Sequence, residues 1–151
     1  MPVTIETSDT QGCMPVERDM LIELAERVLS QESRDLAAIS ITLVDNATIQ
    51  RLNQRHLGHD WPTDVISFPL SVPEDPVLCG ELVISIEMAL AQARGVGAHP
   101  RDELALYVVH GLLHLCGYDD MTDARALAMR RREIEVLAAA GFANPYESRV
   151  P

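Results

Sequence analysis

The sequence predicts an α+β fold, with one compact domain in which a roughly four-stranded mixed sheet packs with about five helices. Three observations support this prediction. Strand-like and helix-like patterns alternate along the chain, residues 104–115 are apolar on almost every side, and 47% of the 151 residues are hydrophobic. A chain of this size can bury a single core of ordinary volume. We therefore expect residues 1–151 to form one domain around a central buried helix.

The first half of the chain predicts two strands and two helices. Residues 3–7 (VTIET) are typical of a strand, and an amphipathic helix is expected from Pro15, because proline and acidic residues favour helix starts. Residues 38–45 alternate between apolar and polar side chains, as strands do. Asp45 can then cap a short helix over residues 47–55.

The second half predicts two strands and three helices. A loop over residues 57–63 leads to a strand over residues 64–68 (DVISF). A connection with three prolines over residues 69–77 then leads to a strand over residues 81–85 (ELVIS). The helices that follow are expected from residue 86 to Gly95 or Gly97, from about Pro100 through the apolar segment, and from Thr122 to Ala140.

The segment HGLLHLCGYDD, residues 110–120, combines two metal-ligand spacings. His110 and His114 are four residues apart, so on a helix their imidazoles lie on one face and can share a cation. Gly117 can end the helix and turn the chain back, which positions Asp120 as a third ligand. Two imidazoles and one carboxylate leave a position open on the ion, as catalytic sites do. The sequence therefore predicts a catalytic metal centre, with the metal-ligand histidines on the central buried helix.

The alternative is that both histidines are core residues and that Asp119 and Asp120 are ordinary turn residues. The apolar character of the helix argues against this alternative, because each unsatisfied buried polar group costs roughly 1–3 kcal/mol. One shared cation satisfies both rings. Glu103 and Tyr107 share the helical face of His110, so either could orient its ring.

The spacing of these residues resembles the zinc-protease pattern HExxHxxGxxH. Gly111, however, occupies the position of the glutamate that serves as the general base in those proteases. Peptide hydrolysis by that mechanism is therefore not expected. A second alternative is the two-histidine, one-carboxylate site of non-haem iron oxygenases. It is disfavoured because the chain does not suggest the all-β barrel that we expect for that chemistry.

Two further blocks precede the histidine segment, namely DWPTDVISFP at residues 60–69 and GELVIS at residues 80–85, with Leu52 and Asn53 upstream. In the same order, these blocks resemble the motifs DxPTDVLSFP, GDIxIS and HGxLHLxGYDH of the YbeY family of rRNA-maturation endoribonucleases. In that family the last motif carries three zinc-binding histidines. The resemblance implies a single-strand-specific, metal-dependent endoribonuclease that acts in small-subunit rRNA maturation and ribosome quality control.

The resemblance also implies one zinc ion per chain, held by His110, His114 and Asp120. Asp120 replaces the third histidine of the family, and carboxylate oxygen is an acceptable zinc ligand that can shift the preference toward harder ions. Another divalent transition metal is therefore an open alternative. Leu57 stands where the family often has an arginine, and whether Arg55 substitutes for it is open.

The sequence pattern does not indicate which residue acts as the general base. Asp119 is the nearest carboxylate in sequence and is the catalytic candidate, although it can instead point away and anchor the loop. The attacking oxygen can be a metal-activated water or the 2′-hydroxyl of RNA. Thr63, Asp64 and Ser67 could line the cleft, and Trp61 could stack on a base.

Charge and composition limit the partners. Twelve basic residues, all arginine, and 23 acidic residues give a net charge of −11, so the average field repels polyanions. A short RNA contact nevertheless requires only a few cations. Arg130, Arg131 and Arg132 are expected to form a solvated helix face, with Arg131 paired to Glu135. The expected partners are single-stranded RNA, in particular rRNA, and the small ribosomal subunit or its proteins, without DNA or a membrane.

A cytoplasmic location is expected, because the chain has no run of 18 apolar residues and no secretory pattern at its start. Cys13, Cys79 and Cys116 form no CxxC pair and fit reduced thiols, with Cys116 in the core. The competing interpretation is a non-catalytic ribosome-assembly or RNA-binding factor with a structural metal. The departures at Leu57 and Asp120 are the reason to consider it.

Overall fold

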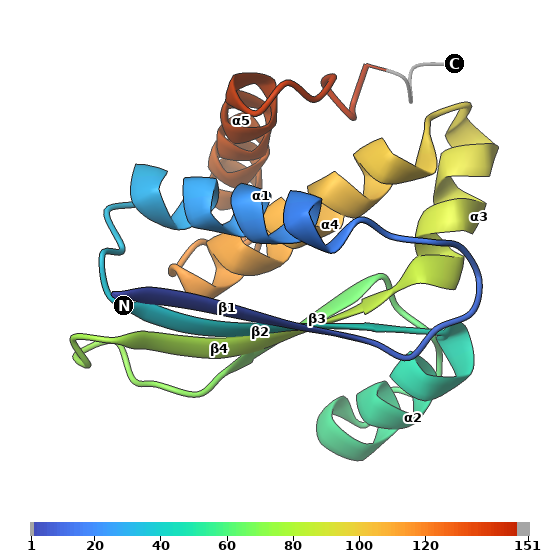
Figure 1. Cartoon of the computed structure of the whole chain (residues 1–151), viewed down its shortest axis with the longest axis horizontal. Helices are drawn as coiled ribbons and strands as arrows, with labels where there is room; N and C mark the ends of the chain where they lie inside the picture. Colours follow the sequence, from blue (N-terminus) through green and yellow to red (C-terminus); the bar gives the residue numbers. More distant parts are fainter. Residues whose placement is uncertain (1, 148–151) are drawn as a thin grey trace.

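The computed structural model describes residues 2–147, and Figure 1 shows how their helices and strands are arranged. In chain order the elements are β1 (Val3–Asp9), α1 (Arg18–Gln31), β2 (Ala37–Val44), α2 (Asn46–Leu57), β3 (Val65–Pro69), β4 (Leu78–Ser85), α3 (Ile86–Val96), α4 (Pro100–Leu115) and α5 (Asp123–Ala139). The described residues thus form four strands and five helices, which confirms the predicted α+β domain. None of the described helices is long and apolar enough to cross a membrane.

The strands form one mixed sheet in the order β1-β2-β4-β3. β2 pairs in parallel with β1 and β4, whereas β3 runs antiparallel to β4. Helices α1, α3, α4 and α5 lie on one side of the sheet and α2 lies on the other (Figure 1). In this strand order β3 lies at an edge of the sheet. It contacts α4, which lies on the face of the sheet covered by four helices.

Helix α4 is the centre of the core, as predicted. It contacts α1, α3, α5 and the sheet, so its side chains are covered in nearly every direction. That coverage explains why the segment is apolar on all sides and carries no amphipathic stripe. Apart from His110, its residues from Glu103 to Leu113 are buried. His110 and His114 are only half-buried and lie where this helix reaches the surface.

Gly111 allows α4 to approach the sheet closely. A Cβ atom at this position would lie 2.8 Å from Cδ2 of Leu82 and 3.2 Å from Oγ of Ser67. The Ser67 hydroxyl also donates a hydrogen bond of 3.0 Å to the carbonyl of Gly111. Position 111 therefore has no room for the glutamate of a zinc protease.

Two elements begin three residues away from the predicted position, and the other boundaries differ by two residues or fewer. α1 begins at Arg18 rather than at Pro15, and β4 begins at Leu78 rather than at residue 81. The sheet explains the second difference, because the parallel ladder starts where Ala37 pairs with Leu78. Strand pairing is a property of the folded sheet, and a local pattern of side chains does not reveal it.

Candidate metal centre

The two histidines of α4 face each other at its C-terminal end. Nε2 of His110 lies 3.1 Å from Nε2 of His114, and the ring planes are 86° apart. One helical turn separates the residues, which places both rings on the same face of α4. The structure thus brings together the pair that the sequence predicted.

The other ring nitrogens are engaged by acceptors. Nδ1 of His110 donates to Oε2 of Glu133 at 2.5 Å, and Nδ1 of His114 donates to the carbonyl of Tyr118 at 3.1 Å. A neutral imidazole whose Nδ1 carries the proton has an unprotonated Nε2. The two lone pairs would then face each other and repel unless a proton or a metal ion lies between them. The donor set therefore fits a bound metal ion.

Asp120 completes a group of three possible ligands. Gly117 adopts a left-handed backbone with φ of 108°, which turns the chain after α4 as predicted. One potential ligand atom from each of His110, His114 and Asp120 lies within 4.8 Å of the others. Asp120 is exposed, so its carboxylate is accessible from solvent. Two nitrogens and one oxygen form a donor set that zinc and other divalent transition metals accept.

Glu133 on α5 is the functional residue that the sequence analysis missed. Glu103 and Tyr107 were the candidates for orienting an imidazole, but the group that contacts Nδ1 of His110 is Glu133. The hydroxyl of Tyr146 donates to the other oxygen of the same carboxylate. A signal was present in the sequence, because Glu133 falls in the buried stripe of α5 that also contains Met129, Val136 and Leu137. An acidic residue in an apolar stripe requires a partner.

The charge of Glu133 also changes the proton affinity of the site. Burial disfavours the protonated form of His110, but the hydrogen bond and negative charge of Glu133 outweigh burial and raise the pKa of His110. The carboxylates of Asp64 and Asp120 act in the same direction. The site therefore favours positive charge, whether it is carried by a proton or by a metal ion.

Asp119 is positioned differently from its neighbour. Its Oδ1 accepts a hydrogen bond of 3.0 Å from the amide of Met121, and its Oδ2 lies 3.4 Å from a guanidinium nitrogen of Arg125. These contacts connect the turn after α4 to the start of α5. They favour the loop-anchoring alternative over the role of general base.

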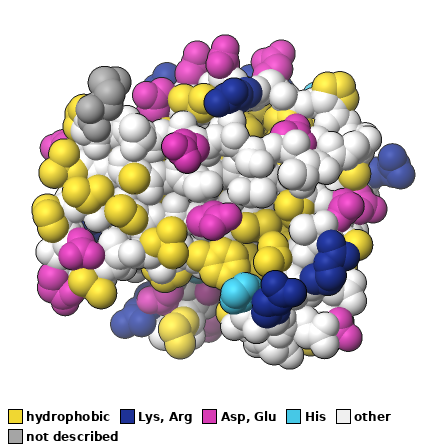
Figure 2. Space-filling view, turned by 60° about the horizontal axis from the view of Figure 1, so that its bottom comes forward, with side chains coloured by type: hydrophobic (Ala, Val, Ile, Leu, Met, Phe, Trp, Pro, Cys, Tyr) yellow, Lys and Arg dark blue, Asp and Glu magenta, His cyan; other side chains and the backbone are white. Residues whose placement is uncertain are grey.

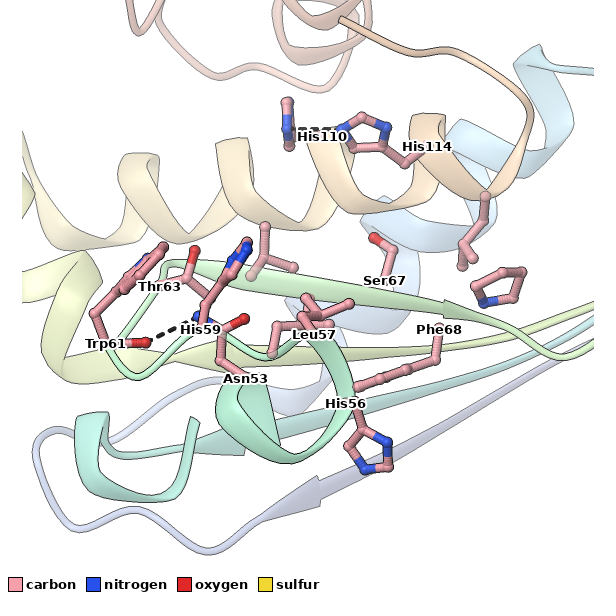
Figure 3. Close-up of a pocket in the computed structure, with 14 residues that line it drawn as sticks. Asn53, His56, Leu57, His59, Trp61, Thr63, Ser67, Phe68, His110 and His114 are labelled. Carbon is pink, nitrogen blue, oxygen red and sulfur yellow. Dashed lines mark hydrogen bonds between the residues drawn. The ribbon is translucent and has the colours of Figure 1, made fainter. Parts of the chain in front are cut away.

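A groove of about 600 Å³ contains both histidines. Figure 3 shows β3 beneath the histidines of α4, with the end of α2 and the loop after it on the other side of the groove. Thr63 and Ser67 line the groove, as expected from the sequence. Asp64 instead borders a separate cavity of about 250 Å³ that also contacts His110.

The loop after α2 is held against that helix. α2 begins with the predicted cap, in which Asp45 accepts a bond of 2.8 Å from the amide of Thr48. Gly58 ends the helix in the left-handed conformation. The buried side chain of Asn53 then donates to the carbonyl of Trp61 at 2.9 Å. The groove wall formed by this loop is therefore well defined.

The arginine cluster of α5 does not form one solvated face. Arg132 binds the carboxylate of Glu32 at 2.7 Å and the carbonyl of Gln31 at 3.2 Å, which connects α5 to the end of α1. It also contacts Glu135 at 3.4 Å, the partner expected for Arg131. Arg130 lies over the ring of Tyr146 at 4.4 Å. Tertiary contacts therefore engage two of the three arginines.

The three cysteines are free thiols. Cys116 is half-buried and packs against the hydrophobic core, as expected. Burial raises the pKa of its thiol to about 11. A thiol with such a pKa stays protonated near neutral pH and is a poor metal ligand.

The three candidate donors fit a metal-dependent hydrolase, and comparison with known proteins identifies the family. Residues 5–141 match the family model described as Endoribonuclease YbeY. The chain belongs to the endoribonuclease YbeY family.

Curated relatives and a solved structure agree with this assignment. The Endoribonuclease YbeY of Rhodopirellula baltica is 41% identical over 136 residues, which cover 89% of this chain and 70% of the relative. The Endoribonuclease YbeY of Carboxydothermus hydrogenoformans is 38% identical, covering 91% of this chain and 97% of the relative. The solution structure of TM1509 from Thermotoga maritima has a TM-score of 0.62, with 27% identity and 95% of both chains covered.

Proposed function

We propose that this chain cleaves single-stranded RNA by metal-assisted hydrolysis, with His110, His114 and Asp120 holding the ion. Endoribonuclease activity follows from membership of the family. One observation carries the assignment of the site. The two Nε2 atoms are 3.1 Å apart while both Nδ1 atoms face protein acceptors, which supports a cation shared by the two histidines.

Zinc is the proposed ion, and the oxygen ligand from Asp120 makes another divalent transition metal acceptable. When bound, such an ion supplies Lewis-acid activation of water and of a phosphate oxygen. The chain fixes the ligands for this chemistry. Glu133 holds the Nδ1 proton of His110, and the carbonyl of Tyr118 holds that of His114. Both Nε2 atoms are thereby kept available for the metal.

The biological setting is part of the same proposal. We assign the activity to maturation of small-subunit rRNA in the cytoplasm, with the small ribosomal subunit or its proteins as partners. Residues 1–151 are taken as a single metallo-endoribonuclease domain. Support comes from the resemblance in the three sequence blocks and from the name shared by the curated relatives. No contact within residues 2–147 specifically favours a non-catalytic assembly factor or a protease.

Cleavage assays with matched substrates test this function. The metal-loaded protein is incubated with a labelled single-stranded RNA, with the same RNA annealed to its complement, and with unfolded casein. We expect cleavage of the single strand, little cleavage of the duplex, no cleavage of casein, and loss of activity after chelation. RNA cleavage that survives removal of the metal would contradict the mechanism. Chelator-sensitive cleavage of casein would contradict the substrate.

A further inference from the structure

The groove beside the candidate metal centre is lined by apolar, aromatic, histidine and neutral polar side chains. Its lining residues are Asn53, His56, Leu57, His59, Trp61, Thr63, Val65, Ile66, Ser67, Phe68, Pro69, His110, His114 and Leu115. No arginine, aspartate or glutamate is among these described residues, although the chain carries a net charge of −11. Apart from the proposed metal ion and the histidines, the groove therefore offers no cation to a phosphate backbone. Binding of the nucleotides on either side of the cleaved phosphate must therefore use another part of the nucleotide.

Trp61 and His59 form an aromatic stack at one end of the groove. Their ring centroids are 4.5 Å apart with an interplanar angle of 12°, and Trp61 is 55% exposed. The intervening backbone is fixed, because Asn53 donates to the carbonyl of Trp61 and accepts at its own carbonyl from the amide of His59. Gln50 also donates to the side chain of Asp60. An exposed indole on an anchored loop is an available stacking surface.

A second aromatic pair lies at the other end of the groove. The ring of His56 packs edge-on against Phe68 at 5.3 Å. Figure 3 shows the Trp61 and His59 rings near the start of β3 and the Phe68 and His56 rings near its end. Both pairs line the groove that also contains the histidines of the metal centre. A strand lying along β3 would therefore pass aromatic rings on both sides of the metal centre.

The hydroxyl and amide side chains of the groove make hydrogen bonds within the protein. Ser67 donates to the carbonyl of Gly111, Thr63 to the carboxylate of Asp64, and Asn53 to the carbonyl of Trp61. Ring faces and aliphatic surface remain for a ligand. Stacking on such faces tolerates any base, because every base has a π-face.

We propose that Trp61, supported by His59, stacks an unpaired base of the RNA substrate and thereby selects single strands. This inference rests on the proposed function and adds the subsite that binds the strand. Bases in a duplex are stacked on each other and are not available to the indole. Phosphates other than the one at the proposed metal ion would lie outside the groove, where α2 carries the exposed Arg51 and Arg55. On the face that includes α2, Figure 2 shows a small group of basic side chains beside a histidine and hydrophobic side chains.

Intrinsic fluorescence tests the stack directly, because Trp61 is the only tryptophan of the chain. Metal-free protein is titrated with a short oligoadenylate, with an abasic oligomer of equal charge, and with the oligoadenylate annealed to oligouridylate. We expect the single strand to quench the emission at concentrations at which the abasic oligomer and the duplex leave it unchanged. Equal quenching by the abasic oligomer, or no quenching by the single strand, would overturn the proposal.

Steady-state cleavage provides the second test. Trp61→Leu should raise KM roughly tenfold or more with kcat changed less than threefold, because one base–aromatic stack is lost. Trp61→Phe should keep KM within about threefold of the parent.

Leu127→Ala is the matched control, since Leu127 is an exposed hydrophobic residue of α5 that does not line the groove. A normal KM for Trp61→Leu would refute the stack while leaving the nuclease assignment intact. Absence of cleavage by the parent would refute the nuclease while the fluorescence result still decides the stack.

Discussion

Oε2 of Glu133 lies 2.5 Å from Nδ1 of His110, although the two residues are 23 positions apart and belong to different helices. The side chain of Glu133 is only 2% exposed, so water screens its charge weakly. Its second oxygen accepts from the hydroxyl of Tyr146 in the C-terminal segment. Packing of α5 against α4 therefore sets the orientation of His110, a proposed metal ligand.

Replacing Glu133 with Gln should weaken metal binding by roughly 10- to 100-fold, the usual effect of losing a partner that orients a ligating histidine. The amide keeps the shape of the side chain but removes its charge. Glu135→Gln is the matched control, because Glu135 is on the same helix and is 65% exposed. Competition with a chromophoric chelator measures both affinities. An unchanged affinity for Glu133→Gln would show that the contact does not support the metal.

The third ligand is tested by two substitutions of Asp120. Asp120→Ala should weaken zinc binding by more than about tenfold, because it removes an oxygen ligand. Asp120→His should retain or tighten zinc binding, since it supplies the third imidazole found in the family. Both variants should fold normally, because Asp120 is exposed. If the Ala variant binds zinc as tightly as the parent, the third ligand is not Asp120.

Asp119→Asn distinguishes an anchoring role from a catalytic one. The amide oxygen can still accept from the amide of Met121, so we expect kcat to fall less than about tenfold. Removal of a general base typically lowers the rate by about 10²- to 10⁴-fold. A loss in that range with normal metal content and normal unfolding would restore Asp119 to the catalytic role predicted from the sequence.

Gly111 and Gly95 form a matched pair for the packing of α4. Gly111→Ala should lower the free energy of unfolding by roughly 1–3 kcal/mol, because the added Cβ overlaps Leu82 in a packed core. Gly95→Ala in α3 should raise it by up to about 1 kcal/mol, since no atom lies within 4 Å of the new Cβ and alanine favours helix. Denaturant unfolding of both metal-free variants measures the difference. Equal stabilities would refute the close approach of α4 to the sheet.

Local patterns in the sequence predicted the features that depend on neighbours along the chain. The four-residue spacing of His110 and His114 survives folding because α4 is regular, and the turn at Gly117 brings Asp120 back as expected. The five helices and four strands follow from periodicity and from turn residues in the same way. These features require only the geometry of one helix, one strand or one turn.

Features that depend on packing could not be obtained in this way. The contact between Glu133 and His110 requires the angle between α4 and α5, which no local pattern specifies. The groove around Trp61 likewise requires β3, α4 and the loop after α2 to meet. Tertiary structure also decides which arginine contacts Glu135. Arg132, rather than the predicted Arg131, is the partner, because Glu32 at the end of α1 binds its guanidinium group.

The central claim is that His110 and His114 share a catalytic metal ion, and one experiment tests it most directly. Metal content by elemental analysis and cleavage of a single-stranded RNA are measured together for the parent, His114→Ala and His99→Asn. His99 caps α4 through its side chain, and asparagine preserves that cap, so this control removes an imidazole outside the site. We expect one transition metal per chain and RNA cleavage for the parent and the control, and neither for His114→Ala. A His114→Ala protein that retains its metal and cleaves RNA would contradict the account.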